Sequence, residues 1–201
     1  MSLSPNSQDQ NNLREFPIKL NGKTQVGVLH LPAVPPGILL VLHEGIVPPL
    51  ARAVVDRLGL AHLPLESSGA VPASASEEVI IAIDWLRQRA NTRTRPLIVY
   101  IRGSAMATQA ALKMAQARAN DIVGLILHHP NMDEDQAAFS DVNVPILIIT
   151  PQADTLTEQI PAEARVDVLT DNGAEDISAT LADWMRPYLE SPQIQEPDDT
   201  P

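Results

Sequence analysis

Cysteine, clustered positive charge and long apolar runs are all missing from this chain of 201 residues. The absence of cysteine excludes disulfides, thiolate catalysis and metal sites built on cysteine. Only 14 lysines and arginines stand against 25 acidic residues, and the net charge of −11 argues against nucleic acid or an anionic membrane as a partner. No apolar run is long enough to cross a membrane, and the N-terminal segment lacks the apolar core of a signal peptide. We therefore expect no nucleic-acid partner, no membrane insertion and a cytoplasmic location, or a periplasmic one if a signal peptide has been removed.

Aromatic residues are also scarce, at 3%, whereas apolar residues make up 44% of the chain. The hydrophobic core must therefore be built from leucine, isoleucine, valine and alanine. Residues 1–12 are polar, and residues 190–201 combine prolines and acids without a cation, a composition typical of disordered segments. We expect one globular domain over residues 13–189 between two disordered ends.

Short apolar runs alternate with helical patterns along this domain. Continuous runs of β-branched and aliphatic residues indicate strands that are buried on both faces, as in a parallel sheet. The alternation predicts an α/β fold, a three-layer sandwich whose mostly parallel sheet has about seven or eight strands. The predicted strands are 15–20, 24–30, 37–43, 60–65, 97–102, 121–128, 143–150 and 164–170, with a hairpin across Asn21-Gly22.

Helical spacing of apolar residues predicts helices over 47–58, 75–90, 105–118 and 177–189. Ser74 and Glu77 have the spacing of a capping box, which predicts that the second helix begins next to Ser74. Pro48 and Pro49 suit the first turn of the first helix, where a backbone N–H has no partner in any case.

The turn after strand 97–102 carries the most information about function. It reads Gly103-Ser104-Ala105-Met106-Ala107 and is followed by Ala111-Leu112. This stretch resembles the α/β-hydrolase superfamily, in which G-x-S-x-G lies between a buried strand and a helix and presents the nucleophile. In the register set by the strand end and by Ala111-Leu112, the resemblance places Ala105 at the nucleophile position. An alanine side chain has no lone pair with which to attack a carbonyl.

Two other registers of this turn remain open. Ser104 becomes the nucleophile if the frame shifts by one residue, which puts the bulky Arg102 and Met106 at the glycine positions of the motif. Alternatively Gly103 itself occupies the strained position, because glycine adopts positive φ without steric cost. The second of these registers also lacks a nucleophile.

The other two positions of the family's catalytic triad are incomplete as well. Asp154 follows strand 143–150 and matches the family's acid, although an N-cap of the next turn would equally account for it. Asp176 occupies the place of the family's histidine. No histidine follows His129, so a triad in the family's chain order cannot be assembled. The chain is thus similar to a degenerate member of the superfamily. It is also similar to bacterial hydrolase-fold proteins in which the nucleophile-bearing turn, called the elbow, is altered.

Several polar residues lie at the predicted carboxyl edge of the sheet, where α/β folds bind ligands. His43 and Glu44 follow strand 37–43, where the family places an oxyanion-hole amide, or else form a plain strand-end loop. His128 and His129 are adjacent, so we expect their side chains to point to opposite sides of the strand. His43, Glu44 and His128, together with Arg102, form the predicted rim of a pocket.

Arg102 ends a buried strand, so we expect it to pair with Asp154 or Asp176, or with an anionic ligand. A rearranged triad of Ser104, His129 and Asp154 remains an alternative, because triads are defined by geometry rather than by order. Since adjacent histidines on a strand diverge and no spaced ligand pair is present, we predict no metal site and no cofactor.

The predicted function is that of a catalytically inactive α/β-hydrolase-fold protein that binds a small ligand or a protein partner. The short connection between the strands at 121–128 and 143–150 leaves little room for a lid, and a shallow open edge favours a protein partner. The alternative is an esterase or related hydrolase with a non-standard site that uses Ser104 and a strand-end histidine.

Overall fold

The computed structural model contains a single eight-stranded β-sheet with helices on both faces. The structure describes residues 13–20, 23–67, 72–89, 91–103, 105–130, 139–151, 164–171 and 177–190. It also describes two isolated residues, Ala153 and Ile160. The predicted disordered segments, 1–12 and 190–201, lie outside these ranges except for Glu190, which ends the last helix.

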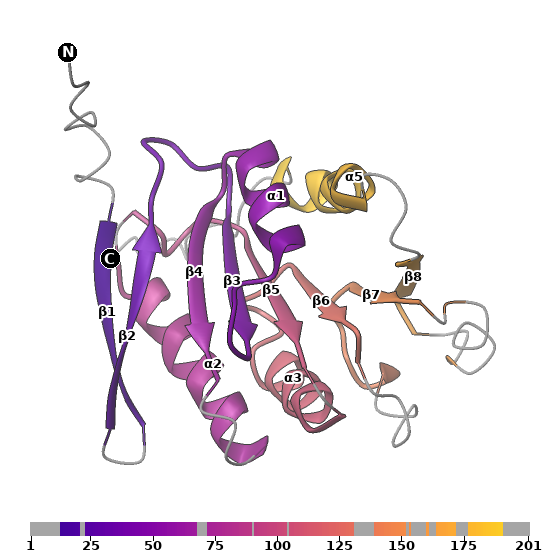
Figure 1. The fold of residues 1–201 in the computed structure, drawn as a ribbon, viewed down its shortest axis with the longest axis horizontal. Coiled ribbons are helices and arrows are strands. Elements are labelled where there is room, and N and C mark those ends of the chain that lie inside the picture. The colour runs from indigo at the N-terminus through magenta and orange to yellow at the C-terminus, as the bar shows by residue number, and fades with distance from the viewer. Residues whose placement is uncertain are drawn as a thin grey trace, which may run out of the picture.

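The sheet has the strand order β1-β2-β4-β3-β5-β6-β7-β8, and Figure 1 shows it running across the molecule. The first two strands are antiparallel to each other, and β2 is antiparallel to β4, whereas all neighbours from β4 to β8 are parallel. Each strand overlaps an apolar run predicted from the sequence, so the predicted three-layer α/β architecture is confirmed. The strands are β1 (Leu13–Leu20), β2 (Lys23–His30), β3 (Ile38–His43), β4 (Ala61–Glu66), β5 (Leu97–Arg102), β6 (Gly124–His128), β7 (Ile146–Thr150) and β8 (Val166–Thr170).

The strand order changes direction at β3, which pairs with β4 on one side and β5 on the other. The chain first moves from β3 to β4 and then returns across β3 to β5, β6, β7 and β8. Loops that leave the carboxyl ends of strands at such a point diverge, and the space between them is the usual ligand site of an α/β sheet. The positions that follow β3 and β5 are therefore the first place to look for function.

Among the described residues, two pairs of helices cover the two faces of the sheet (Figure 1). Helices α1 (Pro49–Leu58) and α5 (Ile177–Glu190) pack against each other and bury Val54, Leu181 and Met185 on one face. Helices α2 (Pro72–Arg87) and α3 (Ala105–Ala117) cover the opposite face. Successive residues of a strand contact opposite faces, so each central strand contributes to both cores.

The helix ends agree with the sequence in one case and differ in another. Pro48 precedes α1 and Pro49 is its first residue, as predicted, and the helix ends at Gly59, whose φ of 64° suits glycine. The predicted start of α2 is wrong, because this helix begins at Pro72 and Ser74 therefore lies inside it. Proline at the first turn replaces the capping box as the signal for this helix start.

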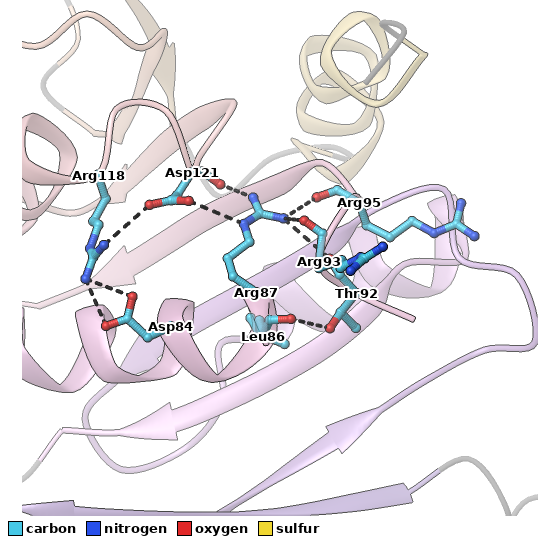
Figure 2. A network of polar contacts seen from close by, with 8 residues as sticks. All are labelled: Asp84, Leu86, Arg87, Thr92, Arg93, Arg95, Arg118 and Asp121. Carbon is cyan, nitrogen blue, oxygen red and sulfur yellow. Dashed lines mark hydrogen bonds and ion pairs between the residues drawn. The ribbon is translucent and has the colours of Figure 1, made fainter. Parts of the chain in front are cut away.

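A polar network ties α2 to α3 at the amino end of the sheet, far from the strand ends that would bear a site (Figure 2). The guanidinium of Arg87 donates hydrogen bonds to the backbone carbonyls of Arg93 (2.8 Å), Arg95 (2.9 Å) and Asp121. Arg118 bonds the Asp84 carboxylate at 2.8 Å. These contacts give hydrogen-bond partners to exposed and part-buried loop carbonyls and connect the ends of the two helices, so the network has a structural role.

Candidate functional site

The polar cluster at the carboxyl edge of the sheet begins with two side chains from neighbouring strands. Tyr100 in β5 and His128 at the end of β6 both face the α1/α5 side, and the Tyr100 hydroxyl is hydrogen-bonded to Nδ1 of His128. Tyr100 is completely buried, and His128 is 6% exposed. The ring of His128 is thereby fixed in one orientation beneath the edge.

The third residue of this cluster, Asp171, directly follows strand β8. Its backbone N–H donates to the carbonyl of Thr150 at 2.9 Å, which continues the β7–β8 ladder by one residue and holds the aspartate in place. Its Oδ2 atom lies 3.3 Å from Nε2 of His128. Both ring nitrogens of His128 are therefore engaged, one by a phenol and one by a carboxylate.

His129 joins the same carboxylate from the other side. Its Nε2 atom lies 2.9 Å from Oδ2 of Asp171, and its ring centroid is 4.4 Å from that of His128. The expectation that the two adjacent histidines would diverge is wrong. The strand ends at His128, and His129 has a φ of 52°, in the left-handed region, so the alternation of side chains across a strand stops at that point.

The electrostatics of the cluster keep His128 neutral. Burial lowers the pKa of His128 to about 4, against the hydrogen bond and negative charge of Asp171, which raise it, while His129 and Arg102 lower it. Desolvation disfavours the charged imidazolium, which explains the direction. At pH 7 this ring carries a single proton. Its two nitrogens face the Tyr100 hydroxyl and the Asp171 carboxylate.

The predicted rim residues are divided between buried and exposed positions. His43 ends β3, is 5% exposed, and has a pKa lowered by burial despite the opposing effect of Glu66. Glu44 and Arg102 are exposed. We expected Arg102 to pair with an acid because its charge would be buried at the end of a strand. That expectation of burial is wrong, because the side chain is exposed to solvent.

The residues of the elbow and of the predicted acid positions are described only in part. Ser104, Asp154 and Asp176 lie outside the described residues, so the structure leaves their roles as predictions. Gly103 follows β5, and Ala105 is the first residue of α3. A strand before this segment and a helix after it are therefore present, as the resemblance implies.

Sequence reasoning missed Tyr100 and Asp171 as members of the site. Tyr100 was read only as part of a buried apolar strand, although it is the one tyrosine that precedes the elbow. Asp171 was not singled out, because only Asp176 in the same segment matched a position of the family's triad. A usable signal was present, because Asp171 is the first residue after a predicted strand and so belongs at the same edge as the strand-end histidines.

Comparisons with known proteins agree on the fold. No protein-family model matches the sequence, and no curated protein sequence matches it. Among solved structures, a dienelactone hydrolase from Anabaena variabilis ATCC 29413 superposes with a TM-score of 0.68 at 19% identity, covering 89% of this chain and all of that one. Est1E from Butyrivibrio proteoclasticus gives 0.64 at 12% identity, covering 87% and 98% of the two chains. A cold-adapted esterase from an Arctic intertidal metagenomic library gives 0.64 at 16% identity, covering 94% and 100%.

These similarities establish that the chain has the α/β-hydrolase fold, as the turn after β5 predicted. At such low identity the likeness concerns architecture, and function has to be argued from the site. Within the described residues, no helix combines the length and the apolar character that a bilayer crossing requires.

Proposed function

We propose that this chain is a catalytically inactive α/β-hydrolase-fold protein that acts by binding a small ligand or a protein partner. The observation that carries the proposal is the identity of residue 105. Ala105 is the first residue of α3, and the resemblance to the superfamily assigns this residue to the nucleophile position of the motif. An alanine there cannot form a covalent intermediate.

The arrangement of His128 supports the same conclusion. A general base needs a ring nitrogen that can reach a substrate or a nucleophile. In His128 one nitrogen is bonded to Tyr100 and the other faces Asp171, and the ring is buried. This histidine stabilises the sheet edge rather than transferring protons to a substrate.

The alternative function, a hydrolase with a non-standard site, is favoured by one observation. His129 is exposed, and its Nε2 is held by Asp171 at 2.9 Å. A carboxylate that orients an imidazole is the arrangement found behind catalytic serines, and Nδ1 of His129 would be the nitrogen left to accept a proton. In this alternative Ser104 is the nucleophile, and Asp171 takes the part that the sequence assigned to Asp154.

Hydrolysis of short p-nitrophenyl esters tests both functions, since esterases occur among the solved structures of similar fold. The unmodified chain is assayed in the presence of a metal chelator beside Ser104→Ala and His129→Ala, with an active esterase as a positive control. No turnover above background in any of the three supports the inactive protein. Turnover that disappears in Ser104→Ala and falls in His129→Ala would overturn it and establish the rearranged triad.

A second measurement guards against an unsuitable ester. A fluorophosphonate probe labels activated serines irrespective of the acyl group that an enzyme prefers. We expect no labelling of the unmodified chain. Labelling that is lost in Ser104→Ala would show an activated serine and refute the proposed inactivity.

A further inference from the structure

Two imidazole nitrogens and a carboxylate oxygen converge at the carboxyl edge of the sheet. One ring nitrogen of His128, one ring nitrogen of His129 and an oxygen of Asp171 all lie within 4.8 Å of one another. From this convergence we propose that these three side chains bind a divalent metal ion of the zinc class, with a fourth coordination place open to water. The proposal is independent of whether the chain hydrolyses esters.

The distances suit a metal ion of this kind. Zinc binds imidazole nitrogen and carboxylate oxygen at about 2.0–2.2 Å, which makes the ligand-to-ligand edge of a tetrahedron about 3.3–3.5 Å. The two histidine nitrogens lie 3.3 and 2.9 Å from the same oxygen of Asp171. Small rotations of the exposed His129 and the half-buried Asp171 side chains therefore suffice to place an ion among the three atoms. Imidazole and carboxylate together favour zinc over the harder calcium and magnesium ions.

Tyr100 supplies the outer contact that a ligating histidine normally has. A metal-bound imidazole usually forms a hydrogen bond through its other nitrogen, which orients the ring and sets its tautomer. In His128 that other nitrogen is Nδ1, and it is bonded to the buried Tyr100 hydroxyl. Because a hydroxyl can both donate and accept, Tyr100 can partner Nδ1 when the Nε2 lone pair is directed to a metal.

The backbone at His129 is strained in a way that creates the cluster. A φ of 52° is uncommon outside glycine and costs about 1 kcal/mol or more. Among the described non-glycine residues, His129 alone has positive φ. The consequence of this conformation is that its ring meets Asp171 beside His128, whereas a continued strand would have turned it away. Such strain concentrates at functional sites.

The charges around the cluster are mixed but permit a cation. Arg102 is near enough to lower the pKa of His128, so it opposes a metal ion. It is also exposed, so solvent screens its charge. Asp171 supplies a negative charge at the site itself, and the whole chain carries a net charge of −11.

Metal binding by the purified full chain tests the proposal directly. The protein is stripped with a chelator and titrated with Zn²⁺ against a chromophoric competitor, and Co²⁺ is then used because its absorption spectrum reports four-coordinate geometry. His129→Gly removes one ligand at a position whose φ glycine adopts freely, so folding is preserved. Asp171→Asn removes the charged ligand. The matched control is His30→Ala, which removes an exposed histidine on β2, away from the cluster.

We expect one zinc ion per chain and a tetrahedral Co²⁺ spectrum. His129→Gly and Asp171→Asn should each weaken binding more than about 100-fold, beyond the roughly 10–100-fold typical of losing a group that hydrogen-bonds a ligand. Tyr100→Phe should fall within that smaller range, and His30→Ala should bind as the unmodified chain does. The proposal is overturned if the unmodified chain binds no zinc, or if binding survives in both ligand variants, which would make it adventitious.

Discussion

Acid should destabilise this protein through His62, and replacing His62 with glutamine should remove that part of its acid sensitivity. His62 lies in β4, is 8% exposed, and has its ring centroid 6.0 Å from that of His30. Burial lowers the pKa of His62 from 6.5 to about 4, and the nearby positive charges of His30, Arg52 and His43 act in the same direction. At about pH 5 the ring is therefore neutral in the folded chain and charged in the unfolded chain.

The sign and size of the effect follow from proton linkage. Between the folded pKa of about 4 and the unfolded pKa of 6.5 the unfolded chain binds a proton that the folded chain does not, so the free energy of unfolding falls as the pH drops through this window. At about 1.4 kcal/mol per pKa unit, the loss attributable to His62 is about 2 kcal/mol between about pH 8 and pH 5, and about 3 kcal/mol below the folded pKa.

Urea unfolding at both pH values measures this loss. His62→Gln should lose about 2 kcal/mol less than the unmodified chain between the two pH values, which corresponds to a difference on the order of 1 M urea in the midpoint shift. Other groups whose pKa values are lowered by burial, such as His128, act alike in both proteins and cancel in this comparison. His30→Gln is the control and should keep most of the loss. An equal loss in His62→Gln and in the unmodified chain would refute the reasoning from burial.

Three further changes probe the packing of the fold by urea unfolding at about pH 8. Arg87→Ala should lower the free energy of unfolding by about 1–3 kcal/mol because it removes the hydrogen bonds to the carbonyls of Arg93, Arg95 and Asp121, whereas the more exposed Arg118→Ala should cost less than about 1 kcal/mol; equal costs would contradict the structural role of Arg87. Gly124→Ala should cost about 1–3 kcal/mol because the added methyl group would lie 3.2 Å from the ring of Trp184, and an unchanged midpoint would show that this contact is loose. Tyr100→Phe should cost about 1–3 kcal/mol by removing the partner of a buried ring nitrogen, and a neutral effect would mean that water replaces the hydroxyl.

Most of the architecture could be predicted because burial leaves a local pattern. Strand β5 reads Leu-Ile-Val-Tyr-Ile-Arg, and only its last residue is exposed, as expected of a strand covered on both faces. The helix ends were predictable only where the local chemistry was unambiguous. Pro49 set the start of α1, whereas the serine and glutamate at capping-box spacing lay within α2.

The polar cluster lies at the edge of the sheet where the sequence predicted polar residues, but the sequence analysis named only His128 and His129 among its four members. The sequence predicted that His128 ends a strand. It did not predict the partners of His128, which come from β5 and from the residue after β8. Tyr100 and Asp171 are 28 and 43 positions away from His128 in the chain, and no short-range sequence pattern indicates contacts at such separations. The direction of His129 was misjudged because a single φ value at the end of a strand reverses it.

By itself, the sequence determined the fold class and the edge of the sheet at which polar side chains would gather. These properties depend on residue identity and on patterns repeated over a few residues. The tertiary structure alone decided that Tyr100, His128, His129 and Asp171 meet, because their meeting depends on strand order, on the register between strands and on one left-handed residue. Strand order and register are set by the packing of the whole sheet, which no local stretch of sequence encodes.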